Sequence, residues 1–235
     1  MLVAFRVDAS VDIGTGHVMR CITLADEMRQ AGHHCVFVTR EHPGHLGELI
    51  ASSEHELYLL PCAEGVVLST EKSSSAYANW LGVPWLHDAR ETVKILGELH
   101  ADWLVVDHYA LDERWEREVS GFVGRIMVID DLADREHSCD VLLDQNLGRK
   151  SEDYHQLVSP GCVRLIGPHY AMLRPEFAEL REQSLRRRKN PEVKRVLISL
   201  GGVDRDNVTG KVLSALSVAQ LSPEVVLDIV MGAAA

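Results

Sequence analysis

The 235-residue chain combines 46% hydrophobic with 25% charged residues, the balance of an ordinary globular protein. This composition excludes collagen, coiled coils and wholesale disorder. The 35 acidic residues outnumber the 24 basic ones, and the net charge of −11 disfavours a general binder of nucleic acid or anionic membranes, because such partners require clustered Lys and Arg. A small anionic ligand needs only a local site and is compatible with this charge.

Membrane and disulfide signals are missing from the sequence. No stretch approaches the ~18 apolar residues of a membrane span, and no basic leader follows Met1. The five cysteines, at positions 21, 35, 62, 139 and 162, are odd in number and contain no CxxC pair, so neither a disulfide framework nor a zinc ribbon is predicted. We therefore expect a cytoplasmic protein with reduced, mostly buried cysteines and neither a membrane nor a nucleic-acid partner.

Short apolar runs alternate with amphipathic segments of helix length. Runs that are apolar on both faces and separated by helices are typical of a parallel sheet covered on both sides, so the sequence predicts an α/β fold. The predicted strands cover residues 2–7, 35–39, 103–107, 125–129, 140–143, 195–200 and 225–230. The predicted helices cover residues 18–31, 44–52, 91–99, 112–120, 151–157, 173–188 and 206–219.

A basic run between residues 181 and 195 precedes the sixth predicted strand. We interpret it as a solvated helix end in preference to a phosphate contact, since a helix dipole favours cations there. Pro191 disfavours helix at Asn190, so the predicted domains are residues 1–190 and 191–235. Because two βα units cannot cover a doubly wound sheet, we expect the second domain to be incomplete or completed by another chain, which the sequence does not identify.

Polar residues recur where the predicted strands end. Asp107, Asp130-Asp131, Asp144 and Asp204 each follow an apolar run. In open α/β sheets ligands bind beyond the carboxyl ends of the strands. The recurrence therefore predicts a binding site at this edge, although a single carboxylate there is often just a helix cap.

The segment from Ile13 to Arg20, IGTGHVMR, follows the first predicted strand. Gly14 and Gly16 permit a tight turn, and the following helix directs free N–H groups and its positive dipole end into the loop, which suits an anionic group. We expect Gly14, Gly16 and Arg20 to contact the substrate. The segment lacks both GxxxxGK[ST] and GxGxxG, so an ATPase or a dinucleotide enzyme is poorly supported.

His17 lies in this loop, where the helix dipole disfavours its protonated form and would keep it a neutral base near pH 7. The residues alone leave a catalytic and a structural role about equally supported. The other histidines show no metal-ligand spacing, so we predict no metal site. A nucleophilic serine or cysteine is not indicated either, because the sequence contains no GxSxG elbow and no cysteine in a nucleophile motif. We expect the tryptophans, Trp80 included, to be core or partly buried surface residues, not stacking platforms.

Several motifs together resemble the PseG family of UDP-sugar hydrolases, which act in pseudaminic acid biosynthesis and are related to spore-coat polysaccharide proteins. The motifs lie in colinear order over nearly the whole chain. They are FRVDAS from Phe5, IGTGHVMRC from Ile13, DHY from Asp107, IDD from Ile129, CDVLLDQN from Cys139, GPHYAMLRPEF from Gly167, and LGGVD from Leu200 with NVT from Asn207.

The resemblance implies a glycosyltransferase-B-like fold of two Rossmann-like domains, with the sugar near the N-terminal domain and UDP held mainly by the C-terminal one. It implies removal of UDP from UDP-2,4-diacetamido-2,4,6-trideoxy-β-L-altropyranose by cleavage at the anomeric carbon, with inversion and without metal or cofactor. The catalytic histidine of the family falls on His17. Further expected substrate contacts are Asp8, Tyr109, Asn146, Tyr170 and Arg174 in the sugar pocket and Gly202, Asp204 and Asn207 on the pyrophosphate side.

Two other functions remain open from the sequence. A glycosyltransferase of the same fold would transfer the sugar to an acceptor alcohol, and such enzymes of lipid-linked substrates usually carry an apolar and basic membrane-facing patch, which residues 1–180 do not show. A non-catalytic protein that binds a nucleotide sugar is the second alternative.

Overall fold

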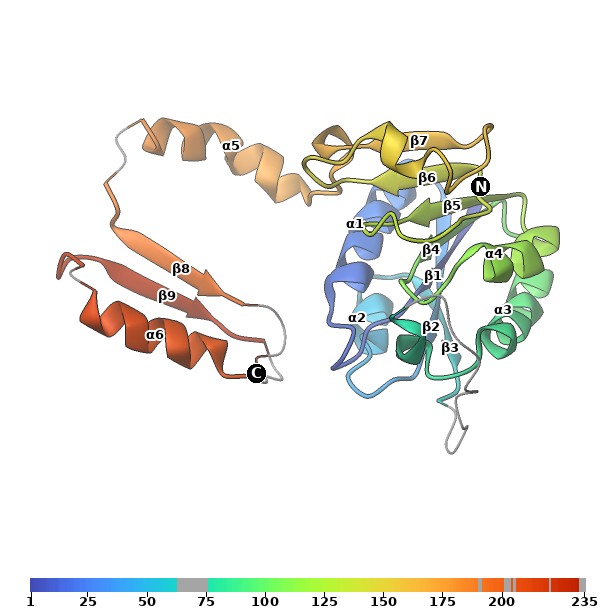
Figure 1. The fold of residues 1–235 in the computed structure, drawn as a ribbon, viewed down its shortest axis with the longest axis horizontal. Helices are drawn as coiled ribbons and strands as arrows, with labels where there is room; N and C mark the ends of the chain where they lie inside the picture. The colour runs from blue at the N-terminus through green and yellow to red at the C-terminus, as the bar shows by residue number, and fades with distance from the viewer. Residues whose placement is uncertain (63–75, 190–191, 201–203, 205, 220, 233–235) are drawn as a thin grey trace. The chain divides into compact units, whose positions relative to one another are not determined.

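The computed structural model describes residues 1–62, 76–189, 192–200, 204, 206–219 and 221–232. The chain divides into two compact units, residues 1–173 and 174–235, called here the N-terminal and C-terminal units (Figure 1). The sequence places the boundary near Asn190, which lies outside the described residues, and so assigns helix α5 (Pro175–Arg187) to the first domain. In the structure α5 groups with the C-terminal unit.

The described part of the N-terminal unit contains one parallel sheet of seven strands in the order β3-β2-β1-β4-β5-β6-β7. The order reverses between β1 and β4, where chain segments leave the sheet toward opposite faces, and such a switch point is the usual ligand site of open α/β sheets. The strands are β1 (Leu2–Val7), β2 (His34–Arg40), β3 (Glu56–Leu60), β4 (Trp103–Asp107), β5 (Arg125–Ile129), β6 (Val141–Asp144) and β7 (Val163–Ile166).

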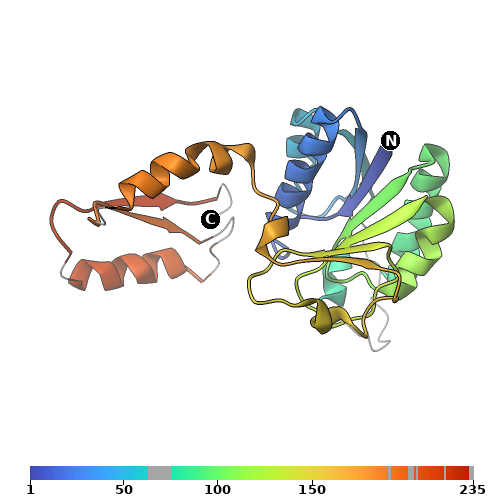
Figure 2. The same cartoon turned by 90° about the horizontal axis from the view of Figure 1, so that it is seen from above.

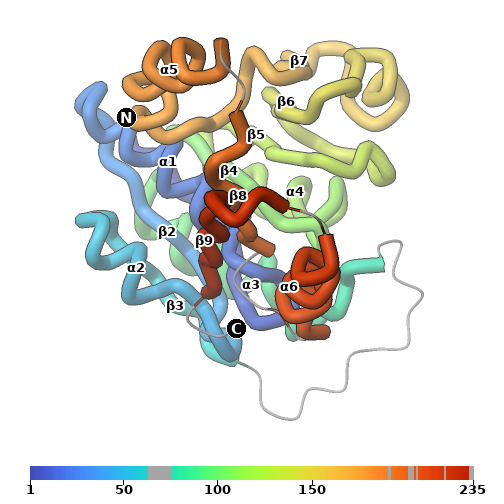
Figure 3. Tube along the Cα trace, turned by 90° about the vertical axis from the view of Figure 1, so that its left-hand side faces the viewer, coloured from blue at the N-terminus to red at the C-terminus, as the bar shows by residue number. Residues whose placement is uncertain are grey.

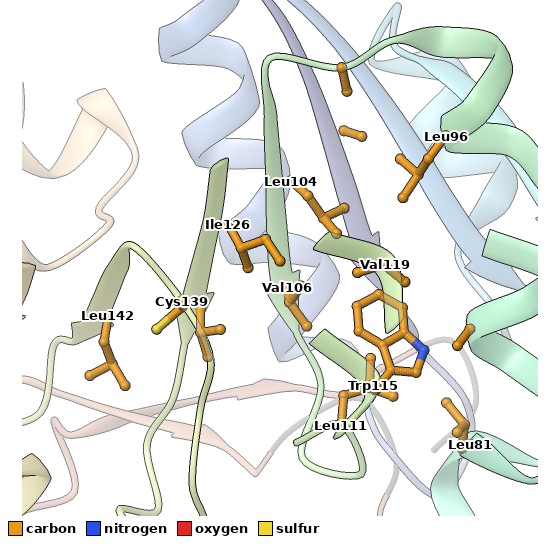
Figure 4. Packing of buried hydrophobic residues seen from close by; sticks show 14 of the residues in the cluster. Leu81, Leu96, Leu104, Val106, Leu111, Trp115, Val119, Ile126, Cys139 and Leu142 are labelled. Atoms are coloured by element: carbon orange, nitrogen blue, oxygen red, sulfur yellow. The ribbon is translucent and has the colours of Figure 1, made fainter. Parts of the chain in front are cut away.

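Helices cover both faces of this sheet (Figures 1 and 2). Helices α1 (Gly16–Gln30) and α2 (Gly47–Ser52) pack on one face, where Val18, Cys21 and Ile50 join the buried residues of β1 and β2. Helices α3 (Trp85–Leu99) and α4 (Glu113–Val119) pack on the other. Fully buried Trp115 of α4 fills the centre of that second core (Figure 4). The remaining helical segments are the 3-10 turns η1 (Ala78–Leu81), η2 (Ser120–Phe122), η3 (Ser151–Tyr154) and η4 (Pro168–Tyr170).

The C-terminal unit contains, in its described part, helix α5 and a parallel pair of strands, β8 (Arg195–Ser199) and β9 (Val226–Val230), connected through α6 (Val208–Val218) (Figure 3). The carboxyl end of β8 leads toward the start of α6, as expected for a βαβ unit. Across the described residues of both units, no helix has the length and apolar character needed to cross a membrane.

The predicted α/β class is confirmed, and each predicted strand overlaps an observed one. The sequence misses β3 and β7, the two outer strands of the sheet. Leu60 is the one buried residue of β3, and β7 has none, so neither outer strand is buried on both faces as the inner strands are. The helix predicted over 151–157 is the short turn η3.

Candidate active site

The first turn of α1 and the end of β4 meet at the switch point of the sheet. Val7 at the end of β1 pairs in register with Asp107 at the end of β4. His17 follows β1 in the first turn of α1, and its Nδ1 lies 2.7 Å from Oδ1 of Asp107. The fold therefore places an imidazole and a carboxylate in contact where ligands of such sheets bind.

Asp107 determines the tautomer of His17. Burial alone would raise the pKa of this fully buried carboxyl, but the hydrogen bonds from Arg20 and the neighbouring His17 outweigh burial and hold the pKa well below its usual range. An ionised carboxylate only accepts hydrogen bonds, so the short contact requires the proton on Nδ1. In the neutral imidazole Nε2 then carries the lone pair; it makes no hydrogen bond to the described residues and belongs to a side chain that is 9% exposed.

Arg20 fixes two carboxylates at this edge. Its Nε and Nη2 each donate to Asp107 over 2.6 Å, and its Nη1 donates to Asp131 at the same distance. Such bidentate charge-assisted bonds hold Asp107 in one orientation. The guanidinium of Arg20 is thus held by Asp107 and Asp131, and its expected contact with the substrate stays a prediction.

Aromatic side chains form a wall beside His17. The ring of Tyr109 meets the imidazole edge to face at a centroid distance of 4.6 Å, and Trp80 stacks on Tyr109 at 5.7 Å. The Tyr109 hydroxyl donates to Asp131 over 2.8 Å, while burial, aided by Asp131, raises the pKa of the phenol. Tyr109 is therefore a hydrogen-bond donor here, not a base. Trp80 is partly buried, as expected, and its ring packs on Tyr109 within the protein.

The loop between β1 and α1 is shaped by its own hydrogen bonds. Ser10 Oγ accepts from the backbone N–H groups of Asp12 and Ile13, and Gly14 adopts φ +80° while its N–H donates to the Ser10 carbonyl. Helix α1 then begins without a side-chain cap and without an acidic residue in its first turn. A Cβ added to Gly16 would meet no atom within 4 Å. The start of α1 thus presents uncapped N–H groups and open space, which suits an anion.

A cavity of about 350 Å³, called here the Trp80 cavity, adjoins this loop. Trp80 both lines the cavity and contacts the imidazole of His17, at a centroid distance of 6.4 Å, so the two sites are neighbours. This volume lies in the range of small-molecule sites. Its lining residues are Ser10, Val11, Asp12, His42, Pro43, Asn79 and Trp80.

Asp8 lies beneath the surface of this region, not in an open pocket. Its carboxylate is fully buried and accepts hydrogen bonds from Arg6 Nη1 at 2.6 Å, Thr39 Oγ1 at 3.1 Å and the Arg40 N–H at 2.7 Å. Burial opposes ionisation, but the Arg6 charge and the imidazoles of His108 and His42 hold the pKa of Asp8 well below its usual range. These contacts give Asp8 a structural role in the fold, and its expected contact with the sugar stays a prediction.

Asn146 joins the same cluster from the end of β6, whereas Tyr170 stands apart. Nδ2 of Asn146 donates to Asp131 over 3.0 Å and to Asp144 over 2.9 Å, and the residue is exposed. Tyr170 lies in η4 and is exposed, and no contact joins it to the His17 cluster within the described residues. The structure thus brings His17, Arg20, Tyr109 and Asn146 together.

The expected residues of the C-terminal unit cap or flank its helices. The Arg174 guanidinium lies 5.8 Å from the ring centre of Phe177. Asp204 accepts from the N–H groups of Val208 and Thr209 at the start of α6, over 2.7 and 2.9 Å. The Thr209 side chain, together with these N–H groups, lowers the pKa of Asp204. Asn207 accepts from Gly210 N–H over 3.1 Å. The start of α6 is thus capped by its own side chains, unlike that of α1; Gly202 lies outside the described residues.

Comparison with known proteins first defines the class. The structure is similar to MurG of Acinetobacter baumannii, with a TM-score of 0.56 at 10% identity, over 98% of this chain and 67% of that one. MurG is a glycosyltransferase-B protein, so the expected glycosyltransferase-B-like fold is confirmed. This likeness concerns the fold alone.

The resemblance to the PseG family is also confirmed. The chain is 27% identical over 217 residues to the UDP-2,4-diacetamido-2,4,6-trideoxy-beta-L-altropyranose hydrolase of Campylobacter jejuni. The aligned region covers 92% of this chain and 66% of that protein. It is 25% identical over 219 residues to an uncharacterized protein of Methanocaldococcus jannaschii, covering 92% of this chain and 40% of that protein. The chain thus spans less than two thirds of the length of each relative. No family model matches it.

Proposed function

We propose that the chain hydrolyses a UDP-sugar at the anomeric carbon and releases UDP. The observation that carries this proposal is the contact between His17 and Asp107, which leaves the lone pair of Nε2 unpartnered among the described residues. The similarity to a relative named as a UDP-sugar hydrolase supports the same chemistry. The His17–Asp107 contact supplies a base, and the relative supplies the substrate class; together they favour an enzyme that acts on a UDP-sugar.

In the proposed reaction His17 acts as general base. Nε2 takes a proton from a water molecule as the water oxygen bonds to the anomeric carbon, while the bond from that carbon to the phosphate oxygen breaks and UDP departs with the electron pair. Asp107 stabilises the imidazolium that forms. UDP needs little help from an acid, because its terminal phosphate has a second pKa of about 6 by analogy with phosphoesters. One direct displacement by water inverts the configuration.

The uncapped start of α1 would stabilise the negative charge of the substrate phosphate. Gly16 leaves space there, and the first-turn N–H groups act together with the helix dipole. We assign Gly14 to the shape of the turn and Gly16 to the approach of the phosphate. This route uses the side chains and backbone of the chain itself, and we propose that it proceeds without metal. Among the described residues, no group of three or more His, Cys, Asp or Glu is arranged to hold a metal ion.

For the substrate, we propose a 2,4-diacetamido-2,4,6-trideoxy hexose linked to UDP, with the free sugar supplied to pseudaminic acid biosynthesis and so to flagellin glycosylation. The name of the Campylobacter jejuni relative supports this choice. The Trp80 cavity fits an acylamino substituent, because Val11 and Pro43 offer apolar contact for a methyl group and Asn79 offers an amide that both donates and accepts. We place this reaction in the cytoplasm.

The assay for this proposal measures free UDP after incubation of the chain with UDP-sugars, with and without an acceptor alcohol. Release in water alone supports the hydrolase. Dependence on the acceptor would identify the glycosyltransferase alternative, and binding without turnover would identify a non-catalytic protein. His34→Ala provides a matched control for His17→Ala, because the His34 side chain is 62% exposed and pairs only with Glu56 among the described residues.

A further inference from the structure

Two cysteines that play no part in the proposed reaction lie in contact. The Sγ atoms of Cys139 and Cys162 are 3.7 Å apart, although the residues are separated by 23 positions in the sequence. Cys139 is 8% and Cys162 6% exposed, and both belong to the core on the α3–α4 face of the sheet. Figure 4 shows Cys139 beside Ile126 in this core.

The sheet itself holds the two sulfurs together. Cys139 and Cys162 precede the neighbouring parallel strands β6 and β7, which pair Val141 with Val163. The N–H of Val163 donates to the carbonyl of Asp140 over 2.9 Å, so the backbones next to both cysteines are bonded to each other. The strand register thus holds the backbones of the two cysteines side by side.

A cavity reaches this pair at Cys139. It has a volume of about 230 Å³, and Cys139 is one of its lining residues. Much of the cavity lining is polar and comes from Arg125, Ser138, Asp140 and Ser159. A small polar oxidant such as a peroxide fits such an entrance, whereas a bulky disulfide reagent does not reach a sulfur this deeply buried.

The two thiols are chemically unequal. The hydrogen bond with Cys139 is the main cause that lowers the pKa of Cys162, and Arg164 acts in the same direction against burial. The same hydrogen bond and burial raise the pKa of Cys139, which therefore keeps its proton. Either sulfur can donate in this hydrogen bond, so a thiolate that forms on one cysteine accepts a hydrogen bond from the thiol of the other.

We propose that Cys139 and Cys162 are a peroxide-reactive pair that closes to a reversible disulfide. The thiolate of one cysteine attacks one peroxide oxygen, the O–O bond breaks, and the departing hydroxide takes a proton, which leaves a sulfenic acid. The thiol of the other cysteine then attacks the sulfenic sulfur, and its proton leaves with the hydroxyl group as water. Two thiols and one hydrogen peroxide thus become one disulfide and two waters.

The test oxidises the folded chain with hydrogen peroxide in the presence of a chelator and maps the unreduced peptides by mass spectrometry. Cys62→Ser is the working background, because Cys62 is exposed and would otherwise join chains. We expect a peptide that links Cys139 to Cys162, is two hydrogens lighter than the separate peptides, and is reversed by dithiothreitol. The disulfide closes a loop between two residues that are 23 positions apart. Because a link of this span stabilises the folded state, Tm should rise by about 5 to 10 °C.

Two variants separate the pair from unspecific oxidation. With Cys139→Ser in the same background, Cys162 should stop at a sulfenic acid that dimedone traps. Cys35 serves as the internal control, since its buried thiol contacts the Ala25 carbonyl and should remain alkylatable. The proposal is overturned if Cys139 and Cys162 both stay fully alkylatable under conditions that oxidise Cys62 of the unmodified chain, or if either proceeds to a sulfinic acid without forming the link.

Discussion

At the scale of single residues, Asp107 decides which nitrogen of His17 is available as a base. It also accepts two hydrogen bonds from Arg20, which in turn holds Asp131. Asp131 accepts from Tyr109, so one chain of contacts runs from the imidazole to the aromatic wall. A change at Asp107 should therefore act on the reaction through His17, without any contact between Asp107 and the substrate.

Asp107→Asn should lower kcat for UDP release by about 10²- to 10⁴-fold, because an amide no longer enforces the proton on Nδ1 of His17. KM should change little, since the residue does not touch the substrate. Steady-state kinetics, with circular dichroism as a check of folding, measure both. Asp26→Asn serves as a comparison, because Asp26 of α1 pairs with Arg29 and His55 and lines neither the His17 site nor the Trp80 cavity; equal kcat values for the two variants would contradict the role of Asp107.

The lowered pKa of Asp107 also predicts a pH dependence of stability. A carboxyl whose pKa is lower in the folded than in the unfolded state stabilises the fold fully above the unfolded pKa of about 3.9, and this stabilisation is lost as pH falls below that value. The difference in free energy of unfolding between the unmodified chain and Asp107→Asn should therefore be constant from pH 7 to about 5 and shrink below about pH 4. Urea denaturation across this range measures it, and a difference that grows on acidification would contradict it.

At the scale of elements, the start of α1 distinguishes its two glycines. Both glycines have open space where a Cβ would lie, but Gly14 adopts a left-handed backbone conformation, whereas Gly16 stands at the first position of the helix. The start of α6, by comparison, is occupied by Asp204 and Asn207. The two βα loops therefore differ in the property that matters for binding an anion, the number of N–H groups left uncapped.

Gly14→Ala should lower the free energy of unfolding by about 1–2 kcal/mol, because an L-residue is strained at this φ. Gly16→Ala should leave stability unchanged or slightly higher, since alanine favours helix, yet should weaken activity by filling the space in front of the N–H groups. Urea denaturation and UDP release measure the two effects separately. Loss of stability in Gly16→Ala with normal activity would contradict this division of roles.

The turn η1 brings Asn79 to the Trp80 cavity, which predicts an effect on substrate binding. Asn79→Ala should raise KM for the diacetamido substrate by about 5- to 10-fold, the equivalent of one lost hydrogen bond of about 1–1.5 kcal/mol. Inhibition by UDP, which lacks the sugar, should be unchanged and serves as the control. If KM stays unchanged while the chain releases UDP normally, the cavity assignment fails and the hydrolase proposal stands.

At the scale of the whole molecule, the sequence predicts the α/β class, the inner strands and the edge of the sheet where polar groups gather. It does so because inner strands are continuous apolar runs and their ends carry Asp107, Asp131 and Asp144. It cannot predict which of these groups meet, since Arg20 contacts residues 87 and 111 positions away. The outer strands β3 and β7 and the stacking of Trp80 on Tyr109 also depend on tertiary packing that no local pattern records.

The most direct test of the account follows the oxygen atom that enters during UDP release. The chain is incubated with the UDP-linked diacetamido sugar in water enriched in oxygen-18, and both products are analysed by mass spectrometry and NMR. We predict the label on the anomeric hydroxyl of a sugar of inverted configuration, unlabelled UDP, and a rate about 10²- to 10⁴-fold lower in His17→Ala than in His34→Ala. Label in the UDP phosphate, or full activity in His17→Ala, would contradict the account.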